Sequence, residues 1–421
     1  MNASTSGVEL ALDVPLNAVA WGAAPPGSVK ALVEEFTSAL EAEMIEFRRD
    51  LHRNPEGSNE EFRTTQKVAE RLEADGLKPQ LMPGSTGLVC DIPGLEPGAP
   101  LLALRADLDA LPVTDEKAVP YRSTVPGFCH ACGHDVHTAG VLGAGLALAR
   151  LSQTQGLPTP VRLVFQPAEE KIAGAQYMMR HGVLNDVGRI LALHCDPKID
   201  VGQVGLKTGP VTSACDLVKL TVKAGAGSGG EIMPPNVVHA VAALTVGVPA
   251  AVSQRMPMGS GVSIVWGHVE ANTGTESTGA LTPETGFMQC TIRCIDERAW
   301  TLVENLFRQA VENIAALHGV TPDLEYTRGI PPVVNEDTSI GLFRRAAEEV
   351  LGKDGATYTE QSLGGEDFAW FVREVPGAMA RLGVRTPGAE RTLDLHQGLF
   401  DVDERAISVA MRLLATAALL N

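Results

Sequence analysis

The stretch from residue 128 to residue 138 gathers side chains that bind metals. Within these eleven residues lie two cysteines, three histidines and an aspartate, in the order Phe128-Cys129-His130-Ala131-Cys132-Gly133-His134-Asp135-Val136-His137-Thr138. The whole chain of 421 residues has only 7 Cys and 10 His, so chance explains the cluster poorly. Thiolate and imidazole are preferred ligands of zinc-like divalent ions. The cluster predicts a metal site, although one segment rarely completes a coordination shell, and a free cysteine with a few core histidines is the plainer interpretation.

Cys132 and His134 precede an apolar run of small residues over 136–151, which predicts a buried helix with both side chains at its N-terminus. The partial positive charge of a helix N-terminus favours a thiolate. The spacing of Cys129 and Cys132 also suits a redox-active pair, so a disulfide is a real alternative. We expect Cys132 to be a metal ligand because His134 stands beside it.

The elements around this cluster predict an α/β layer with a mainly parallel sheet. Apolar strands alternate with helices, which is the pattern of parallel sheets covered on both faces. Two amphipathic helices are expected first, over 28–50 and 60–75. The expected strands are 101–106, 161–165, 189–194 and 378–383, and the further helices are 136–151, 174–181, 340–351, one opening at 364–368, and 404–420.

Acidic residues and a histidine follow the expected strands where each strand ends. Asp107 and Asp109 come after the first strand, Glu169 and Glu170 after the second, and His194 ends the third. Ligands bind beyond the carboxyl ends of such strands, so we expect these side chains on one rim. A Glu-Glu pair is usually a solvated surface pair, but on this rim a functional role is favoured.

The pattern changes at about residue 216, where the order becomes β-α-β-β-α-β. Strands are expected at 216–223, 261–268, 286–295 and 321–327, with helices at 236–254 and 297–318. This order is typical of a ferredoxin-like unit. We therefore predict an N-terminal tail over 1–27, a metal-binding α/β domain over 28–212 and 329–421, and an inserted domain over 213–328, which the family resemblance described below implies to be a lid or dimerisation domain.

Composition excludes several classes of partner. The 51 acidic and 34 basic residues give a net charge of −17, which disfavours nucleic acid or an anionic membrane as partner. No uninterrupted apolar run reaches the ~18 residues of a membrane span. The low density of cysteine fits reduced thiols, and the absence of a basic residue before Lys30 argues against a secretory signal, so we expect a cytoplasmic protein.

The rim and the cysteine-histidine cluster together suit metal-assisted hydrolysis. Two ions that share a site need roughly five to seven protein ligands, some of them bridging, and the late histidine His396 adds to this set. One carboxylate must stay free to act as general base. This content predicts hydrolysis of an amide by activated water.

Five motifs carry a resemblance to a known family. They occur in the order Arg105-Ala106-Asp107-Leu108-Asp109-Ala110-Leu111-Pro112, His130-Ala131-Cys132-Gly133-His134-Asp135, Gln166-Pro167-Ala168-Glu169-Glu170, Gly365-Glu366-Asp367-Phe368 and Leu395-His396. Together they resemble the dinuclear metallopeptidase family of bacterial aminoacylases, hippurate hydrolases and plant auxin-conjugate amidohydrolases. The resemblance covers about residues 35–420.

The resemblance implies roles for individual residues and a mode of assembly. The implied ligands of two divalent ions are Cys132, His134, Glu170, His194 and His396. Zinc is expected first, with manganese, cobalt or nickel as alternatives. Glu169 would be the general base, and Asp107 would orient a metal-ligating side chain. The substrate would be a small molecule with a linear C–N amide bond, and the inserted domain would pair in a homodimer.

Two positions depart from the family pattern. Gly230 stands where the family has a histidine that contacts the scissile carbonyl, and Ala280 where it has an asparagine that holds substrate. Losing one such donor costs about a hundred- to a thousandfold in rate. These changes imply either an amidohydrolase with an unusual substrate or a non-hydrolytic descendant that binds a ligand or catalyses a related acyl transfer in a biosynthetic pathway. The intact Glu169-Glu170 pair favours the first.

Overall fold

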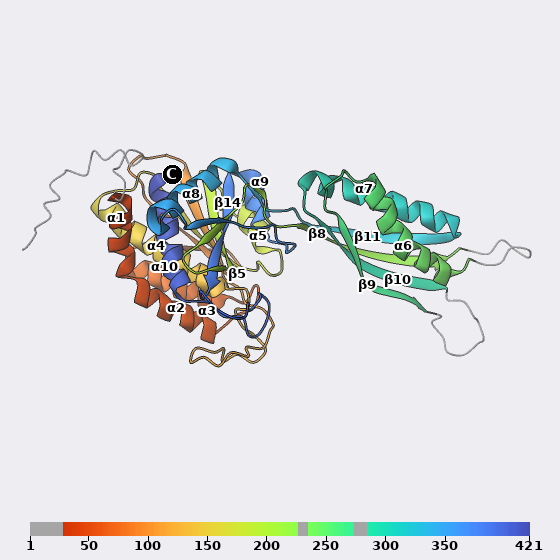
Figure 1. Cartoon of the computed structure of the whole chain (residues 1–421), viewed down its shortest axis with the longest axis horizontal. Helices are drawn as coiled ribbons and strands as arrows, with labels where there is room; N and C mark the ends of the chain where they lie inside the picture. Colours follow the sequence, from red (N-terminus) through yellow and green to blue (C-terminus); the bar gives the residue numbers. More distant parts are fainter. Residues whose placement is uncertain (1–27, 226–234, 273–283) are drawn as a thin grey trace, which may run out of the picture.

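A computed structural model describes residues 28–225, 235–272 and 284–421. Figure 1 shows an eight-stranded sheet with helices on both faces and, beside it, a four-stranded sheet that carries two helices. The predicted fold class, a mainly parallel α/β layer with an inserted ferredoxin-like domain, is confirmed. The predicted tail 1–27 and the two lid positions Gly230 and Ala280 lie outside the described residues.

The large sheet has the strand order β1-β2-β4-β3-β5-β14-β6-β13. Its central strands β4, β3, β5 and β14 are parallel. Antiparallel pairs join β1 to β2, β2 to β4 and β14 to β6, and the edge strand β13 is parallel to β6. The strands are β1 (Gln80–Leu81), β2 (Leu88–Ile92), β3 (Leu101–Asp107), β4 (Val161–Gln166), β5 (Val187–Asp200), β6 (Val204–Leu206), β13 (Ala356–Tyr358) and β14 (Gly377–Arg385). A small pair joins β7 (Gly209–Pro210) to β12 (Val334–Asn335).

Helices build a separate core on each face of this sheet. The larger core lies under α1 (Ser28–Ser38), α2 (Glu41–Arg53), α3 (Phe62–Ala74), α4 (His134–Thr154), α8 (Asp337–Leu351) and α10 (Arg405–Leu420). The smaller core lies under α5 (Gly174–Arg180) and α9 (Ala369–Glu374). The small residues of α4 let α10 approach closely, because a Cβ at Gly143 would stand 2.8 Å from the side chain of Met411. This packing fixes the N-terminus of α4, which bears the cysteine-histidine cluster.

The structure corrects three details of the predicted elements. The helix expected over 28–50 is two helices, α1 and α2, separated by a turn at residues 39 and 40, where the backbone N–H of Leu40 donates to the carbonyl of Thr37 at 3.0 Å. The strands β2 and β6 were missed. Strand β5 continues to Asp200, so His194 lies inside the strand and not at its end.

The second unit is an antiparallel sheet in the order β11-β8-β10-β9. Its elements are β8 (Ala214–Ala224), α6 (Val237–Arg255), β9 (Ser263–Asn272), β10 (Thr285–Cys294), α7 (Glu297–Leu317) and β11 (Val320–Ile330), around a core of their own. Among the described residues, α6 is the helix whose length and apolar composition would suffice to cross a membrane, a property that core helices share. One of its faces packs into this core. The domain boundaries at 213 and 328 stay a prediction.

Candidate active site

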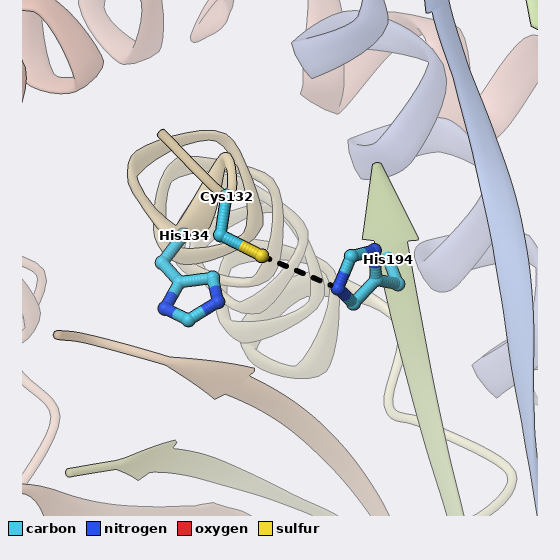
Figure 2. A group of neighbouring side chains, drawn as sticks. All are labelled: Cys132, His134 and His194. Carbon is cyan, nitrogen blue, oxygen red and sulfur yellow. Dashed lines mark hydrogen bonds between the residues drawn. The ribbon is translucent and has the colours of Figure 1, made fainter. Parts of the chain in front are cut away.

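Cys132, His134 and His194 meet where the N-terminus of α4 faces β5. The Sγ atom of Cys132 lies 3.6 Å from Nε2 of His194, and Figure 2 shows the imidazole of His134 on the other side of the thiol. One potential ligand atom of each residue lies within 4.8 Å of the others. Three residues from two elements thus offer a buried group of sulfur and nitrogen donors.

The same thiol belongs to a second group of potential ligands. Nε2 of His396 lies 3.4 Å from Sγ of Cys132 and 3.8 Å from Oε1 of Glu170. One potential ligand atom of each of these three residues lies within 4.8 Å of the other two. The five side chains predicted as metal ligands therefore come together as two groups that share Cys132.

Contacts to backbone oxygens orient the imidazoles of these groups so that their potential metal-ligating nitrogens face one another. Nδ1 of His134 lies 2.8 Å from the backbone oxygen of Asp109, and Nδ1 of His194 lies 2.8 Å from that of Cys195. Each imidazole therefore turns Nε2 inward. Nε2 of His134 and Oε1 of Glu170 are buried and have no hydrogen-bond partner among the described residues. Orphaned buried atoms of this kind suit divalent cations, since burial without a partner is otherwise costly.

Unusual backbone conformations place several of these side chains. Gly133, between Cys132 and His134, has φ +88°, and a Cβ there would stand 2.7 Å from Sγ of Cys195. His396 has φ +63° and Ala168, next to Glu169, has φ +51°. Non-glycine residues adopt positive φ at a cost, and such strain gathers at functional sites.

The turn that presents Glu169 and Glu170 is held by two buried carboxylates. Asp109 accepts the backbone N–H of Glu169 at 3.1 Å and that of Glu170 at 3.0 Å. Glu61 accepts the backbone N–H of Ala168 at 2.8 Å. The sequence placed Asp109 on the rim, but neither the role of its carboxylate nor Glu61 was predicted, because partners 60 residues or more away leave no local pattern.

Asp107, predicted to orient a ligand, contacts two histidines of α4. One of its carboxylate oxygens lies 2.7 Å from Nδ1 of His137, and the other lies 3.7 Å from Nε2 of His134. Burial acts to raise the pKa of Asp107, but His134, His137 and Arg105 outweigh it and hold this pKa well below its usual range. His137 was not predicted as a site residue, although its position three residues after His134 puts both on one helix face.

Buried carboxylates crowd the side of the site next to Glu169. Burial, and then the charges of Glu366 and Glu170, raise the pKa of Glu169 well above its ordinary value. Burial also raises the pKa of Glu170 to about 7 and that of Asp367 to about 7. The guanidinium of Arg105 offsets part of this charge through ion pairs at 3.0 Å with Glu366 and 3.3 Å with Asp367. Glu366 and Asp367 belong to a recognised motif but were not predicted as site residues.

Cys129, the alternative partner of Cys132, takes no part in these groups. Both cysteines are buried free thiols. Burial raises the pKa of each thiol. A disulfide between them is therefore absent from the structure.

A cavity of about 340 Å³ opens onto the predicted ligands. It is lined by Cys132, Glu169, Glu170, His194, Lys198, Thr212, Ser362, Leu363, Gly364, Gly365, Glu366, Arg381, Asp394, Leu395 and His396. A volume of this size accommodates a small organic molecule.

Comparison with known proteins shows the family of this chain. Residues 103–419 match the family described as peptidase family M20/M25/M40. N-acetylcysteine deacetylase of Bacillus subtilis (strain 168) is 34% identical over 91% of this chain and 97% of its own length. The crystal structure of Bacillus subtilis YXEP protein, a dinuclear metal-binding peptidase of the M20 family, superposes with a TM-score of 0.79 at 31% identity, over 91% of this chain and 98% of that one.

A third relative, from Rhodococcus jostii (strain RHA1), is named as a candidate glutamate–cysteine ligase. It is 43% identical over 90% of this chain, and the chain spans 47% of its length. The chain thus belongs to peptidase family M20/M25/M40. It is a metal-dependent hydrolase that acts on amide bonds, and its relatives include dinuclear metal-binding peptidases.

Proposed function

We propose that this protein hydrolyses the amide bond of a small N-acyl amino acid or a related amide, with Glu169 as general base. The predicted metal ligands are retained in this proposal: Cys132, His134, Glu170, His194 and His396. When bound, two divalent ions, zinc first, would polarise the amide carbonyl and lower the pKa of an attacking water.

The difference between the two adjacent glutamates is the observation that carries this assignment. Oε1 of Glu170 lies between two imidazoles, 3.9 Å from Nε2 of His134 and 3.8 Å from Nε2 of His396, as expected of a ligand, whereas Glu169 approaches one of them, with Oε2 4.0 Å from Nε2 of His134. Both glutamates line the cavity, and the carboxylate of Glu169 receives no hydrogen bond from a described residue. It is therefore free to exchange a proton with a substrate.

The proposed reaction uses Glu169 twice. Its carboxylate takes a proton from the water that attacks the carbonyl carbon, and it then gives that proton to the leaving nitrogen as the C–N bond breaks. Burial and the neighbouring carboxylates raise the pKa of Glu169, which makes it a stronger base for the first transfer. Asp107 would hold the α4 histidines through His137, and a homodimer formed through the inserted domain is part of the proposal.

The substrate class rests on relatives and on the lid. The deacetylase of Bacillus subtilis carries the name of an N-acetyl amino acid, which supports an N-acyl amino acid here. Gly230 and Ala280 lack the donors that the family places in its lid, so we propose a substrate that depends little on those contacts.

A panel of N-acetyl and N-benzoyl amino acids, incubated with metal-loaded protein and assayed for free amine, tests the proposal. We expect turnover of at least one member, and Glu169→Gln should abolish most of it. Absence of turnover across the panel, from protein with a full metal content, would favour the non-hydrolytic alternative.

A further inference from the structure

Arg381 differs from the other buried arginines of the described residues in having no carboxylate partner. Arg48 lies 2.7 Å from Asp135, and Arg105 lies 2.7 Å from Asp107. Arg381 is 6% exposed, yet no acidic oxygen of a described residue lies within 4.0 Å of its guanidinium. Its one hydrogen bond to a described residue is a long contact of 3.5 Å to the backbone oxygen of Val211.

The fold places this guanidinium next to the predicted metal ligands. Strand β14 pairs with β5 in parallel register, and Arg381 is the register partner of His194. Register partners project from the same face of a sheet. Arg381 therefore lines the 340 Å³ cavity together with Cys132 and His194.

Arg381 also lines a second cavity that continues from the first. This space of about 550 Å³ shares Lys198, Ser362, Leu363, Arg381, Asp394 and Leu395 with the ligand-lined cavity. Arg381 thus borders both spaces, together with the exposed Lys198. A molecule that extends from the metal ligands into the second space would meet both cations.

An unpaired buried charge is costly, so its presence calls for a partner. A guanidinium has five N–H donors in a planar fork that matches a carboxylate. Burial lowers the pKa of Arg381, and the charges of Asp196 and Glu366 offset only part of this effect. A lone buried charge does not stabilise a fold, so stability alone gives no reason to retain it.

We propose that Arg381, assisted by Lys198, binds a carboxylate of the substrate and makes the enzyme specific for amides that carry one. This inference rests on the proposed amide hydrolysis and adds the residues that would recognise a carboxylate on either half of the substrate. Arg381 acts on binding and orientation, and takes no part in proton transfer. The cavity wall otherwise presents carboxylates, including Glu366 and Asp394, which would repel an anionic substrate without this cation.

Three substrates that differ in the position of one carboxylate test the proposal. N-acetyl-L-alanine carries it on the amine half, N-succinyl-L-alaninamide on the acyl half, and N-acetyl-L-alaninamide has none. We expect the metal-loaded wild type to prefer one of the two anionic substrates over the neutral one by about tenfold or more in kcat/KM. The preferred substrate identifies whether the amine half or the acyl half of the amide faces Arg381.

Arg381→Met should reduce that preference by about ten- to a hundredfold, mainly through KM, because a charged hydrogen bond is lost. Arg381→Lys keeps the charge without the planar fork and should retain part of the preference. Arg385→Met is the matched control, since Arg385 lies on the same strand, pairs with Asp200 and does not line either cavity. The control should keep the wild-type preference.

An unchanged preference in a folded Arg381→Met protein with full metal content would overturn the assignment. Binding of succinate, measured by calorimetry, separates this result from failure of the proposed reaction. If no amide is cleaved but succinate binds at least about tenfold more weakly to Arg381→Met than to wild type, the anion site stands and the hydrolytic function falls. Equal succinate binding by both proteins counts against the anion site.

Discussion

The backbone N–H of Glu169 donates to the carboxylate of Asp109 at 3.1 Å, although the two residues are 60 positions apart. The same carboxylate accepts the N–H of Glu170 at 3.0 Å and the hydroxyl of Ser58 at 2.6 Å. The backbone oxygen of Asp109 also lies 2.8 Å from Nδ1 of His134. Asp109 therefore joins the proposed base, one proposed ligand on the same turn and a second ligand on α4.

We predict that Asp109→Asn lowers kcat/KM by about ten- to a hundredfold, the usual effect of a residue that orients metal ligands. An asparagine offers one acceptor oxygen, and its NH₂ group would face an N–H donor of the turn. Steady-state kinetics with metal analysis measures the effect, and circular dichroism checks the fold. Asp91→Asn, which removes a surface carboxylate paired with Arg162, is the control and should leave kinetics unchanged.

Substitution of the two adjacent glutamates should separate their roles. Glu169→Gln should keep the metal content and reduce turnover by about a hundred- to ten-thousandfold, the range of a lost general base. Glu170→Gln should instead lower the metal content, because its oxygen lies between two imidazoles. If Glu169→Gln loses metal and Glu170→Gln retains it, the two assignments are reversed.

The sequence predicted which side chains the structure brings together, because they lie in compact motifs on or after the central strands and at one helix N-terminus. Cys132 and His134 are neighbours in sequence, and the rim rule brought Glu169, Glu170 and His194 toward them. The place of Arg381 next to the site could not be predicted from the sequence. Its neighbours on β5 are known only once the register between β14 and β5 is known.

The same reasoning explains what was missed in the fold. Strand β2 of five residues and strand β6 of three are too short for a reliable period. The division between α1 and α2 is a turn in which the backbone N–H of Leu40 donates to the carbonyl of Thr37 at 3.0 Å. A hydrophobic pattern that continues at helical spacing across 28–50 does not report such a local hydrogen bond.

Cys132 should be needed for both groups of ligands. We predict that Cys132→Ser lowers metal affinity more than about tenfold at both positions, since a hydroxyl is a poorer ligand than a thiolate for these ions. Competition with a chromogenic chelator measures the affinity. Cys129→Ser, at a buried thiol outside both groups, is the matched control. Equal metal binding by the two variants would contradict the shared-thiol arrangement.

Glu336 caps α8 and should make stability depend on pH. Its carboxylate accepts the backbone N–H groups of Thr338 at 3.0 Å and Ser339 at 2.7 Å. Partial burial acts to raise its pKa, but the hydrogen bonds from Ser339 and Thr338 outweigh this and lower the pKa to about 2. The stabilisation is therefore complete above the ordinary value of 4.5 and is lost as the pH falls through about 2.

We expect Glu336→Ala to reduce the free energy of unfolding by about 1 kcal/mol at pH 7, as for other N-cap losses. The difference from wild type should shrink as the pH is lowered below 4.5. Thermal unfolding at several pH values measures it, with Glu348→Ala on the exposed face of the same helix as control. A difference that stays constant down to the acid limit would contradict the cap as its cause.

Strand β9 is an edge of the four-stranded sheet and should pair with its counterpart in a second subunit. An unpaired edge leaves backbone N–H and C=O groups open, and pairing across a two-fold axis would satisfy them in both subunits. Apolar side chains add to this edge, since Val265 is 55% exposed and Val269 is 42% exposed.

We predict a homodimer at micromolar concentration. The combined change of Val265→Asp and Val269→Asp should shift it to monomer, because like charges would meet across the axis. Light scattering gives the mass of each protein, and Phe62→Asp, at an exposed apolar residue of the catalytic domain, is the control that should stay dimeric. A monomeric wild type, or a β9 variant that remains a dimer, would count against pairing through this edge.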